Sequence, residues 1–192
     1  MLPAATPIEF TSEERALLLD VAHESVLAEF EHRKPGFATP SPHLAEPRGV
    51  FTTIHVQGRL HGCVGYVRPI ISPQPVSLLR AVAETARAAA FEDTRFPPLT
   101  HEETSQLAIS LSILSALKAV RPGEITIGLH GLVVSQNGRR GLLLPQVPVE
   151  HGWDRMAFLE QTCRKAGLAP DAWQNNAVLE VFTAEVFGDG HD

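Results

Sequence analysis

A strictly alternating stretch at residues 107–113 constrains the fold of this chain more than any other feature. Four large apolar residues, Leu107, Ile109, Leu111 and Ile113, alternate there with alanine and serine. Successive side chains of a β-strand point to opposite faces of a sheet. The pattern therefore predicts a strand with its large residues on the core and its small residues on the other face.

Hairpin signals predict further strands. Gln57-Gly58 separates the β-rich residues 50–56 from a second arm that contains "RLHGCVGYV", residues 59–67. Asn137-Gly138 follows a predicted strand at residues 124–134, and the apolar run "LLLP" answers as its partner. Two-residue turns of this kind join neighbouring antiparallel strands.

Three segments predict helices: residues 11–30, 76–91 and 154–166. The first two carry apolar residues at helical spacing. A capping box of Thr11 and Glu14 starts the first helix. Asp154 is the expected N-cap of the third helix, and Gly167 is its expected stop.

The order of the elements predicts the fold class. Helix, strands, helix, strands and helix follow one another, and a final strand is expected at residues 177–187. Because regular βαβ alternation is missing, we expect an α+β fold, a mainly antiparallel sheet with helices packed on it. Prolines make residues 34–48 a predicted surface loop. We expect a single domain at residues 10–192 after a flexible tail at residues 1–9.

An internal echo adds a second hypothesis about the fold. "LHGCV" at residues 60–64 and "LHGLV" at residues 129–133 share four of their five residues. Each lies before or inside a predicted strand. The echo is consistent with two related strand–helix units.

Composition argues against several classes of protein. The net charge is −6, and no lysine–arginine cluster exceeds Arg139-Arg140, so we expect no nucleic-acid partner. No apolar run approaches the roughly 20 residues that span a bilayer, and the first residues lack the pattern of a signal peptide. We therefore expect no membrane association and a cytoplasmic location. Two cysteines cannot supply a four-cysteine zinc site or an iron–sulfur cluster, and nucleotide-binding glycine patterns are absent, so we expect no metal and no cofactor.

Cys63 lies between Gly62 and Gly65 on the second arm of the first hairpin. On an extended strand, His61, Cys63 and the bare face of Gly65 share one side. A thiol beside an imidazole is a nucleophile–base pairing, because a nearby cation favours the reactive thiolate. Glycines on either side would let a substrate approach the backbone. The alternative is that Cys63 is a small buried core residue.

Later residues extend the candidate site. His130, framed by glycines in "GLHGLV", is either a base or a structural histidine bonded to the backbone. Glu150 follows two prolines, four residues after Gln146, and either orients a histidine, binds a substrate amine or is an exposed acid. Arg95 either forms a local salt bridge with Asp93 or receives an anionic group.

Six segments together resemble the AMMECR-one domain family, also called the AmmeMemoRadiSam system protein A family. They cover roughly residues 12–187 in the family's order: "LHGCVG", "AFEDTRFPPL", "ISLSILS", "GLHGLVV", "GRRGLLLPQVPVEHGWD" and "FLEQTCRKAGL". The resemblance implies a compact α+β domain with an antiparallel sheet, and it implies no established reaction. Prokaryotic members are often encoded with a Memo-like protein and a radical SAM protein, which are the implied partners. This chain has no CxxxCxxC motif, so it is not the radical SAM partner itself.

The resemblance also assigns individual positions. The family signature matches at Leu60, Gly62, Cys63 and Gly65, and later motifs match at His130, Gly131, Pro145, Gln146 and Glu150. Position 61 is His where the family commonly has Arg. An arginine would be a permanent cation beside the thiol, whereas His61 is charged only below about pH 6.5.

These residues support two main hypotheses. In the first, the chain is an enzyme that acts on a small molecule or a protein group. Cys63 is then the nucleophile or covalent anchor, His130 or else His61 is the base, and Glu150 orients the base. The substrate-binding residues would be His61, Gly62, Gly65, Arg95 and Gln146. In the second, the chain is a binding module for a Memo-like or radical SAM partner. A metal site of Cys63, His61 and His130 is a third alternative.

Overall fold

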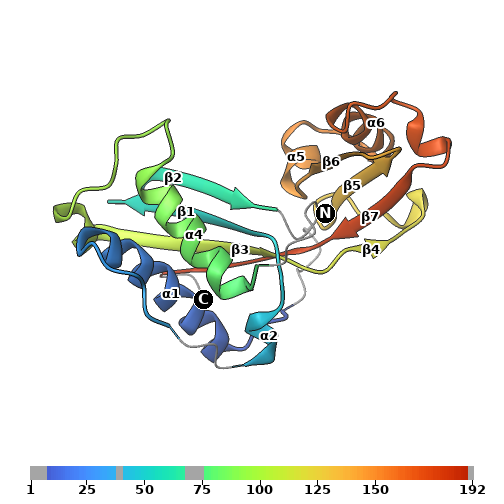
Figure 1. Cartoon of the computed structure of the whole chain (residues 1–192). Coiled ribbons are helices and arrows are strands. Elements are labelled where there is room, and N and C mark those ends of the chain that lie inside the picture. The colour runs from blue at the N-terminus through green and yellow to red at the C-terminus, as the bar shows by residue number, and fades with distance from the viewer. Residues whose placement is uncertain (1–7, 38–40, 68–75, 190–192) are drawn as a thin grey trace. The chain divides into compact units, whose positions relative to one another are not determined.

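A computed structural model describes residues 8–37, 41–67 and 76–189 of the chain. Within them the chain forms two compact units (Figure 1). The N-terminal unit comprises Ile8–Ile113 together with the end of the chain from Glu185, and the central unit comprises Leu114–Ala184. Two antiparallel sheets with accompanying helices confirm the predicted α+β class. The structure describes the two units separately, and the single domain at residues 10–192 stays a prediction.

The N-terminal unit is built on a four-stranded sheet of order β2-β1-β3-β8. Its strands are β1 (Val50–Val56), β2 (Arg59–Tyr66), β3 (Leu107–Leu114) and β8 (Ala184–Gly188). Two long helices, α1 (Ser12–Phe30) and α4 (Leu78–Phe91), accompany the sheet, with the short α2 (Pro42–Ala45) and the 3-10 helix η1 (Glu102–Gln106). Helix α4 packs on β1 and β2, and α1 packs on α4 (Figure 1).

The local signals of this unit are confirmed. Thr11 and Glu14 form the capping box of α1. Gln57 and Gly58 both have positive φ, 52° and 74°, as a tight turn between β1 and β2 requires. Strand β3 buries three of the four large residues of its alternating pattern, Ile109, Leu111 and Ile113, and Leu107 is half-buried.

Alanine lets α4 approach the sheet closely. The buried face of α4 contains five alanines beside larger apolar residues, and Ser77 caps its start. The buried hydroxyls of Thr52 on β1 and Thr85 on α4 are 2.7 Å apart and satisfy each other. A helix with small side chains can lie near the backbone of the strands beneath it. This close approach of α4 leaves no room for a side chain at Gly62 of β2.

A buried carboxylate ties the start of the described chain to β8. Glu185 accepts hydrogen bonds from the backbone N–H groups of Glu9 and Phe10. It also accepts a 2.7 Å bond from the Arg15 guanidinium. Residues 1–7 of the predicted tail lie outside the described residues.

The central unit has a second sheet, of order β4-β7-β5-β6. Its strands are β4 (Lys118–Ala119), β5 (Gly131–Gln136), β6 (Arg139–Leu143) and β7 (Val178–Phe182). Its helices are α5 (Gln146–Glu150) and α6 (Arg155–Lys165), with the 3-10 helices η2 (Pro122–Glu124) and η3 (Ala172–Gln174). Helix α6 packs on β5 and β6, with Asp154 as N-cap and Gly167 just past its end, as predicted. Asn137 and Gly138 form the predicted hairpin turn.

Three predicted elements differ from the structure. The strand expected at residues 124–134 begins only at Gly131, because η2 and a Gly128 with φ of 83° turn the chain beforehand. The loop expected at residues 34–48 contains α2, which Ser41 caps and which buries Leu44, although residues 38–40 lie outside the described part.

The third difference is at the C-terminal strand. Residues 177–187 form two strands that divide at Thr183, with β7 in the central sheet and β8 in the N-terminal sheet. At this point Thr183 exchanges hydrogen bonds with Ser115, which follows β3. An alternating pattern specifies a strand but does not specify its sheet, so the change of sheet left no local signal.

The internal echo falls on different arms of the two hairpins. "LHGCV" lies on β2, the second arm, whereas "LHGLV" leads into β5, a first arm. Each sheet does have a hairpin at its edge, β1–β2 in one and β5–β6 in the other. The echo itself therefore does not align the two hairpins.

Candidate functional site

Cys63 lies on β2, the edge strand of the N-terminal sheet, opposite Thr53 of β1. The Thr53 hydroxyl donates to the Cys63 sulfur across 3.3 Å. Cys63 is half-buried, whereas Cys163, on α6, is fully buried in the core of the central unit. Of the two thiols, Cys63 is the accessible one.

The glycines that frame Cys63 have packing reasons. A Cβ at Gly62 would lie 1.9 Å from the carbonyl oxygen of Ala89 on α4. A Cβ at Gly65 would lie 2.2 Å from the ring of Phe51. Gly62 thus faces α4, and Gly65 makes room for an aromatic ring. The close approach of neighbouring groups accounts for both glycines without a ligand.

An aspartate–arginine pair holds the backbone of Cys63. Because β2 is an edge strand, its outward backbone groups need partners outside the sheet. The Asp93 carboxylate accepts the Cys63 N–H at 2.9 Å, and the Arg95 Nη2 donates to the Cys63 carbonyl at 3.2 Å. Arg95 also donates to both Asp93 oxygens, from Nε at 2.9 Å and from Nη2 at 2.6 Å. We call these two residues the Asp93–Arg95 clamp; they form the predicted local salt bridge, and they also reach the cysteine.

The clamp is electrostatically stable. The Arg95 guanidinium, and next the Cys63 N–H, hold the pKa of Asp93 well below its usual range. The pKa of Arg95 is raised, chiefly by its hydrogen bonds to Asp93 and by the charge of Asp93, with a smaller contribution from Cys63. Arg95 is therefore a permanent cation within electrostatic range of the thiol.

His61 occupies a bulge in β2. His55 pairs with Leu60 and Ile54 with Gly62, so His61 has no partner on β1. Its side chain is buried, and its ring stacks on Phe96 at 6.2 Å between centroids. The bulge breaks the alternation from which a shared face with Cys63 was predicted. The His61 Nε2 has no hydrogen-bond partner among the described residues.

His130 and the residues of α5 lie in the central unit. His130 precedes β5, and its Nδ1 accepts the Thr126 N–H at 3.1 Å. Burial, and then the charge of Lys118, lower the pKa of His130, which favours a neutral ring. Gln146 and Glu150 are the first and last residues of α5 and are exposed. In the described part of the chain Glu150 makes no hydrogen bond to the His130 ring, whose Nδ1 is occupied by backbone.

The candidate residues thus divide between the two units. Cys63 lies with His61, Gly62, Gly65 and Arg95 in the N-terminal unit, whereas His130, Gln146 and Glu150 lie in the central unit. Each unit is described by itself, so the pairing of Cys63 with His130 stays a prediction. No group of three or more His, Cys, Asp or Glu side chains within the described ranges is arranged to hold a metal ion.

The sequence interpretation missed one residue of the candidate site, Asp93. Its two-residue spacing from Arg95 predicted the ion pair, but not the second bond to the Cys63 N–H. That bond requires the end of α4 to lie against β2, which no local pattern encodes. The available signal was the carboxylate placed directly after a helix, in "AFEDTRFPPL".

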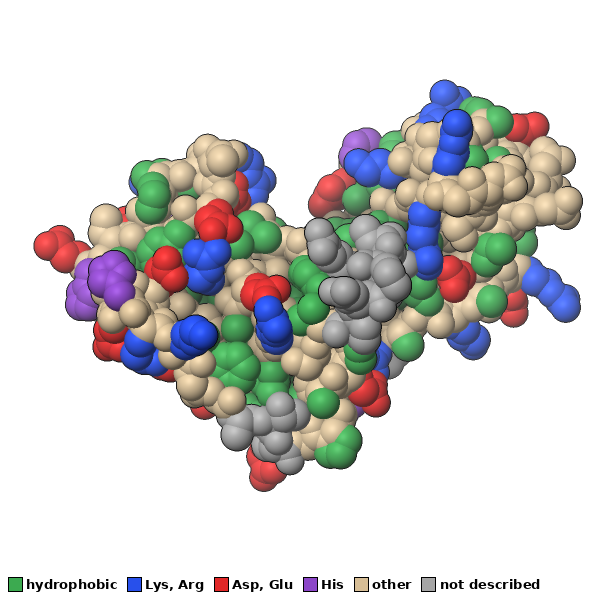
Figure 2. Space-filling model, viewed as in Figure 1, with side chains coloured by type: hydrophobic (Ala, Val, Ile, Leu, Met, Phe, Trp, Pro, Cys, Tyr) green, Lys and Arg blue, Asp and Glu red, His purple; other side chains and the backbone are tan. Residues whose placement is uncertain are grey.

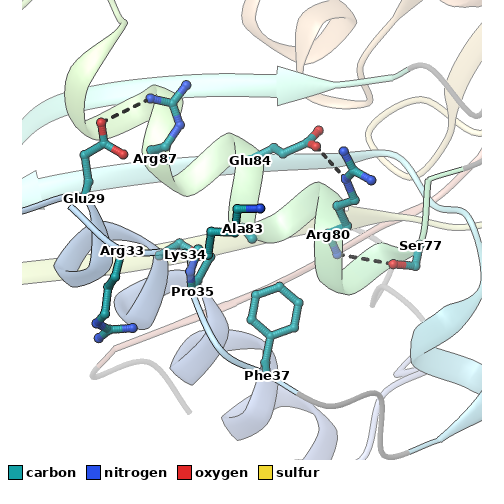
Figure 3. A pocket seen from close by; sticks show the side chains of 11 residues that line it. Glu29, Arg33, Lys34, Pro35, Phe37, Ser77, Arg80, Ala83, Glu84 and Arg87 are labelled. Atoms are coloured by element: carbon teal, nitrogen blue, oxygen red, sulfur yellow. Dashed lines mark hydrogen bonds and ion pairs between the residues drawn. The ribbon is translucent and has the colours of Figure 1, made fainter. Parts of the chain in front are cut away.

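A groove of about 630 Å³ lies elsewhere in the N-terminal unit, between α1, α4 and the segment that follows α1 (Figure 3). Two ion pairs cross or border it, Arg80 with Glu84 at 2.8 Å and Arg87 with Glu29 at 3.6 Å. Figure 2 shows acidic and basic side chains interspersed over the face that carries α1 and α4. Four cationic side chains and two carboxylates line the groove, so its lining carries an excess of two positive charges: Arg33, Lys34, Arg80 and Arg87 against Glu29 and Glu84.

None of the described helices combines the length and the apolar composition that crossing a bilayer requires.

Fold and site together define an α+β protein with two small antiparallel sheets and a half-buried cysteine held on an edge strand by an aspartate–arginine clamp. A family model described as AMMECR1 matches residues 19–187. The chain belongs to the AMMECR1 family, as the motif resemblance predicted.

Individual relatives agree with this assignment. Protein MK0488 of Methanopyrus kandleri is 40% identical over 191 residues, 93% of this chain and 90% of that protein. A protein of Thermococcus gammatolerans is 42% identical over 166 residues, 80% of this chain and 78% of that protein. The crystal structure of the uncharacterized protein PH0010 from Pyrococcus horikoshii superposes with a TM-score of 0.67 at 35% identity and covers 91% of each chain. None of these relatives supplies a reaction.

Proposed function

We propose that this AMMECR1-family chain is an enzyme that acts on a small molecule or a protein group through Cys63. The thiol is the nucleophile or the covalent anchor of the substrate. The observation that carries the proposal is the environment of Cys63: a half-buried cysteine whose sulfur accepts a hydroxyl hydrogen bond from Thr53, on a backbone that the Asp93–Arg95 clamp fixes.

The Thr53 hydroxyl and the fixed backbone of Cys63 both favour nucleophilic chemistry. A hydroxyl that donates to sulfur favours the thiolate, which is the reactive form. The Arg95 cation is paired with the Asp93 carboxylate, so the two charges of the clamp largely cancel next to Cys63. The clamp fixes the position of the backbone, and a nucleophile that is already in place loses little freedom when it reacts.

We assign the remaining roles as in the sequence prediction. His130 is the base, and Glu150 and Gln146 belong to the same site. A neutral histidine can accept a proton, and the lowered pKa of His130 is consistent with that role. We further propose a cytoplasmic location, because a reducing compartment keeps both thiols free.

The rate of alkylation of Cys63 tests the proposal. Iodoacetamide is added at several pH values, and peptide mapping by mass spectrometry reports Cys63 and Cys163 separately. We expect Cys63 to react faster at pH 7 than N-acetylcysteine does, whereas Cys163 stays unmodified because burial raises the pKa of its thiol. A Cys63 that reacts no faster than the model thiol would end the proposal.

Two variants sharpen this experiment. Thr53→Val removes the hydroxyl donor and should slow the reaction of Cys63, whereas Thr53→Ser keeps the donor and should retain the rate. His130→Gln tests the base: its alkylation profile should lose the dependence on the ionisation of His130. Equal rates in Thr53→Val and Thr53→Ser would show that the hydroxyl does not activate the thiol.

One observation favours a second function, a binding module for a Memo-like or radical SAM partner. Packing against Ala89 and Phe51 explains Gly62 and Gly65 without any reacting group, so the signature could build a shape alone. Cys63→Ser discriminates between the two functions. If the chain is a binding module, Cys63→Ser should bind the partner as the wild type does, and cells that carry this variant should behave as wild-type cells do. If the chain is an enzyme, cells that carry Cys63→Ser should behave as cells that lack the protein do.

A further inference from the structure

We propose that the site takes an electrophile that carries an anionic oxygen, and that Arg95, held in place by Asp93, receives that oxygen beside the Cys63 thiol. The inference rests on the proposed function and names the substrate class of the same site.

One of the three guanidinium nitrogens of Arg95 is left to bind a ligand. A guanidinium has five N–H donors. Nε donates to Asp93, and Nη2 donates to Asp93 and to the Cys63 carbonyl, which together use three donors. Nη1 has no hydrogen-bond partner among the residues that the structure describes. Its two N–H groups remain for an incoming acceptor.

The guanidinium is both accessible and fixed. The Arg95 side chain is 59% exposed, whereas the Asp93 side chain that anchors it is 7% exposed. Asp93 also accepts the backbone N–H of Arg95 at 3.2 Å, so one carboxylate orients both ends of the residue. The guanidinium carbon lies 5.5 Å from the centre of the Phe96 ring, which limits its motion on another side. A pre-organised donor binds a ligand at little entropic cost.

The position of Arg95 explains why an anion is the expected ligand. Nη2, which binds the Cys63 carbonyl, is bonded to the same carbon as the unpartnered Nη1, so Nη1 lies close to the backbone of Cys63. The formal charges of Asp93 and Arg95 cancel, so attraction over long distance is small. Selection must therefore act at short range, through a charge-assisted hydrogen bond from Nη1 to an anionic oxygen.

The reaction that this geometry serves is a displacement at an electrophilic carbon. The Cys63 thiol loses its proton to a base, and the sulfur forms a bond to the carbon. The leaving group departs with the electron pair of the bond that breaks. The anionic oxygen stays on Arg95 and orients the carbon toward the sulfur.

Two alkylating agents that differ in charge test the inference. Iodoacetate is anionic, iodoacetamide is neutral, and both transfer a two-carbon group to sulfur with loss of iodide. The measured quantity is the ratio of their rate constants at Cys63. We expect Arg95→Gln to lower this ratio by about three- to fivefold, the effect of one exposed charge-assisted contact.

Further variants test charge against orientation. Arg80→Gln is the matched control, because Arg80 is an exposed arginine on α4 that also pairs with a carboxylate, and the ratio should not change. Arg95→Lys keeps the charge but cannot donate in the same fork, so its ratio should fall toward that of Arg95→Gln. A ratio in Arg95→Gln or in Arg95→Lys equal to that of the wild type would overturn the inference.

A binding measurement is independent of thiol reactivity. Acetate and acetamide are titrated into ¹⁵N-labelled protein, and the amide signals of Cys63 and Arg95 are followed by NMR. We expect acetate to shift both signals in the wild type and not in Arg95→Gln, and we expect acetamide to shift neither. If Cys63 reacts no faster than the model thiol but acetate shifts both amide signals, the proposed function is refuted and the anion site remains. If acetate shifts neither signal, only the anion site is refuted.

Discussion

Gly62→Ala tests the packing explanation of the glycine-framed cysteine. The added methyl would lie 1.9 Å from the Ala89 carbonyl oxygen, and ordinary contact begins near 3.4 Å. Strand β2 and helix α4 must therefore separate locally by about 1.5 Å, and both are backbone elements that cannot simply rotate away. Overpacking of this kind lowers the unfolding free energy by about 1–3 kcal/mol or more. Alanine also has less conformational freedom than glycine in the unfolded chain, which offsets less than about 1 kcal/mol of this loss.

The expected result is a loss of about 2 kcal/mol of unfolding free energy in the N-terminal unit, or a fall of about 8 °C in its melting temperature. Circular dichroism follows the whole chain. Fluorescence follows the central unit, because both tryptophans, Trp153 and Trp173, lie there. Gly36→Ala is the control, because nothing lies within 4 Å of its added Cβ. Equal stabilities of Gly62→Ala and Gly36→Ala would refute the close approach of β2 and α4.

Three further predictions concern charged groups. The hydrogen bond to Glu14 raises the pKa of His43, so His43 should stabilise the fold fully below pH 6.5, and this stabilisation should be lost as the pH rises through the folded-state pKa of His43. The difference in unfolding free energy between wild type and His43→Gln, followed from pH 5.5 to 8.5, measures this stabilisation. Burial lowers the pKa of His130, so the hydrogen bond from the Thr126 N–H to its ring should persist above pH 6.5 and break as the pH falls. In an NMR pH titration, the ring signals of His130 and the amide signal of Thr126 should change with the same midpoint. Glu185→Gln should cost about 2–3 kcal/mol in chemical denaturation, because it leaves a cation without its buried partner.

Local features of the fold were predictable because the sequence encodes them within a few residues. The alternation of β3 identifies its buried face. Gln57-Gly58 and Asn137-Gly138 set both hairpins, because positive φ at two adjacent positions restricts the residue types. Caps at Thr11 and Asp154 set the starts of two helices. Each signal acts through neighbours in the sequence.

Features that depend on distant neighbours were not predictable. The division of residues 177–187 at Thr183 depends on which sheet each half joins. The bulge at His61 depends on the register against β1, and one extra residue moves a side chain out of the alternating pattern. The bond between Asp93 and the Cys63 N–H joins residues 30 positions apart. The residue types of the candidate site, apart from Asp93, were therefore visible in the sequence, whereas the geometry of the site was not.

The structure assigns the permanent cation beside Cys63 to Arg95 rather than to position 61. The motif resemblance implies an arginine at position 61, and this chain has a histidine whose ring is buried on Phe96. Arg95 donates to the Cys63 carbonyl and stays charged at every physiological pH, since Asp93 raises its pKa.

The pH dependence of anion selectivity separates these two sources of charge. If Arg95 receives the anionic oxygen, the ratio of iodoacetate to iodoacetamide rate constants at Cys63 should stay level from pH 6 to pH 9. Both reagents use the same thiolate, so the ionisation of sulfur cancels in the ratio. His61→Gln should leave the profile level, because the histidine ring takes no part. A ratio that falls between pH 6 and pH 7.5 in the wild type, and that is low and flat in His61→Gln, would transfer the role from Arg95 to His61.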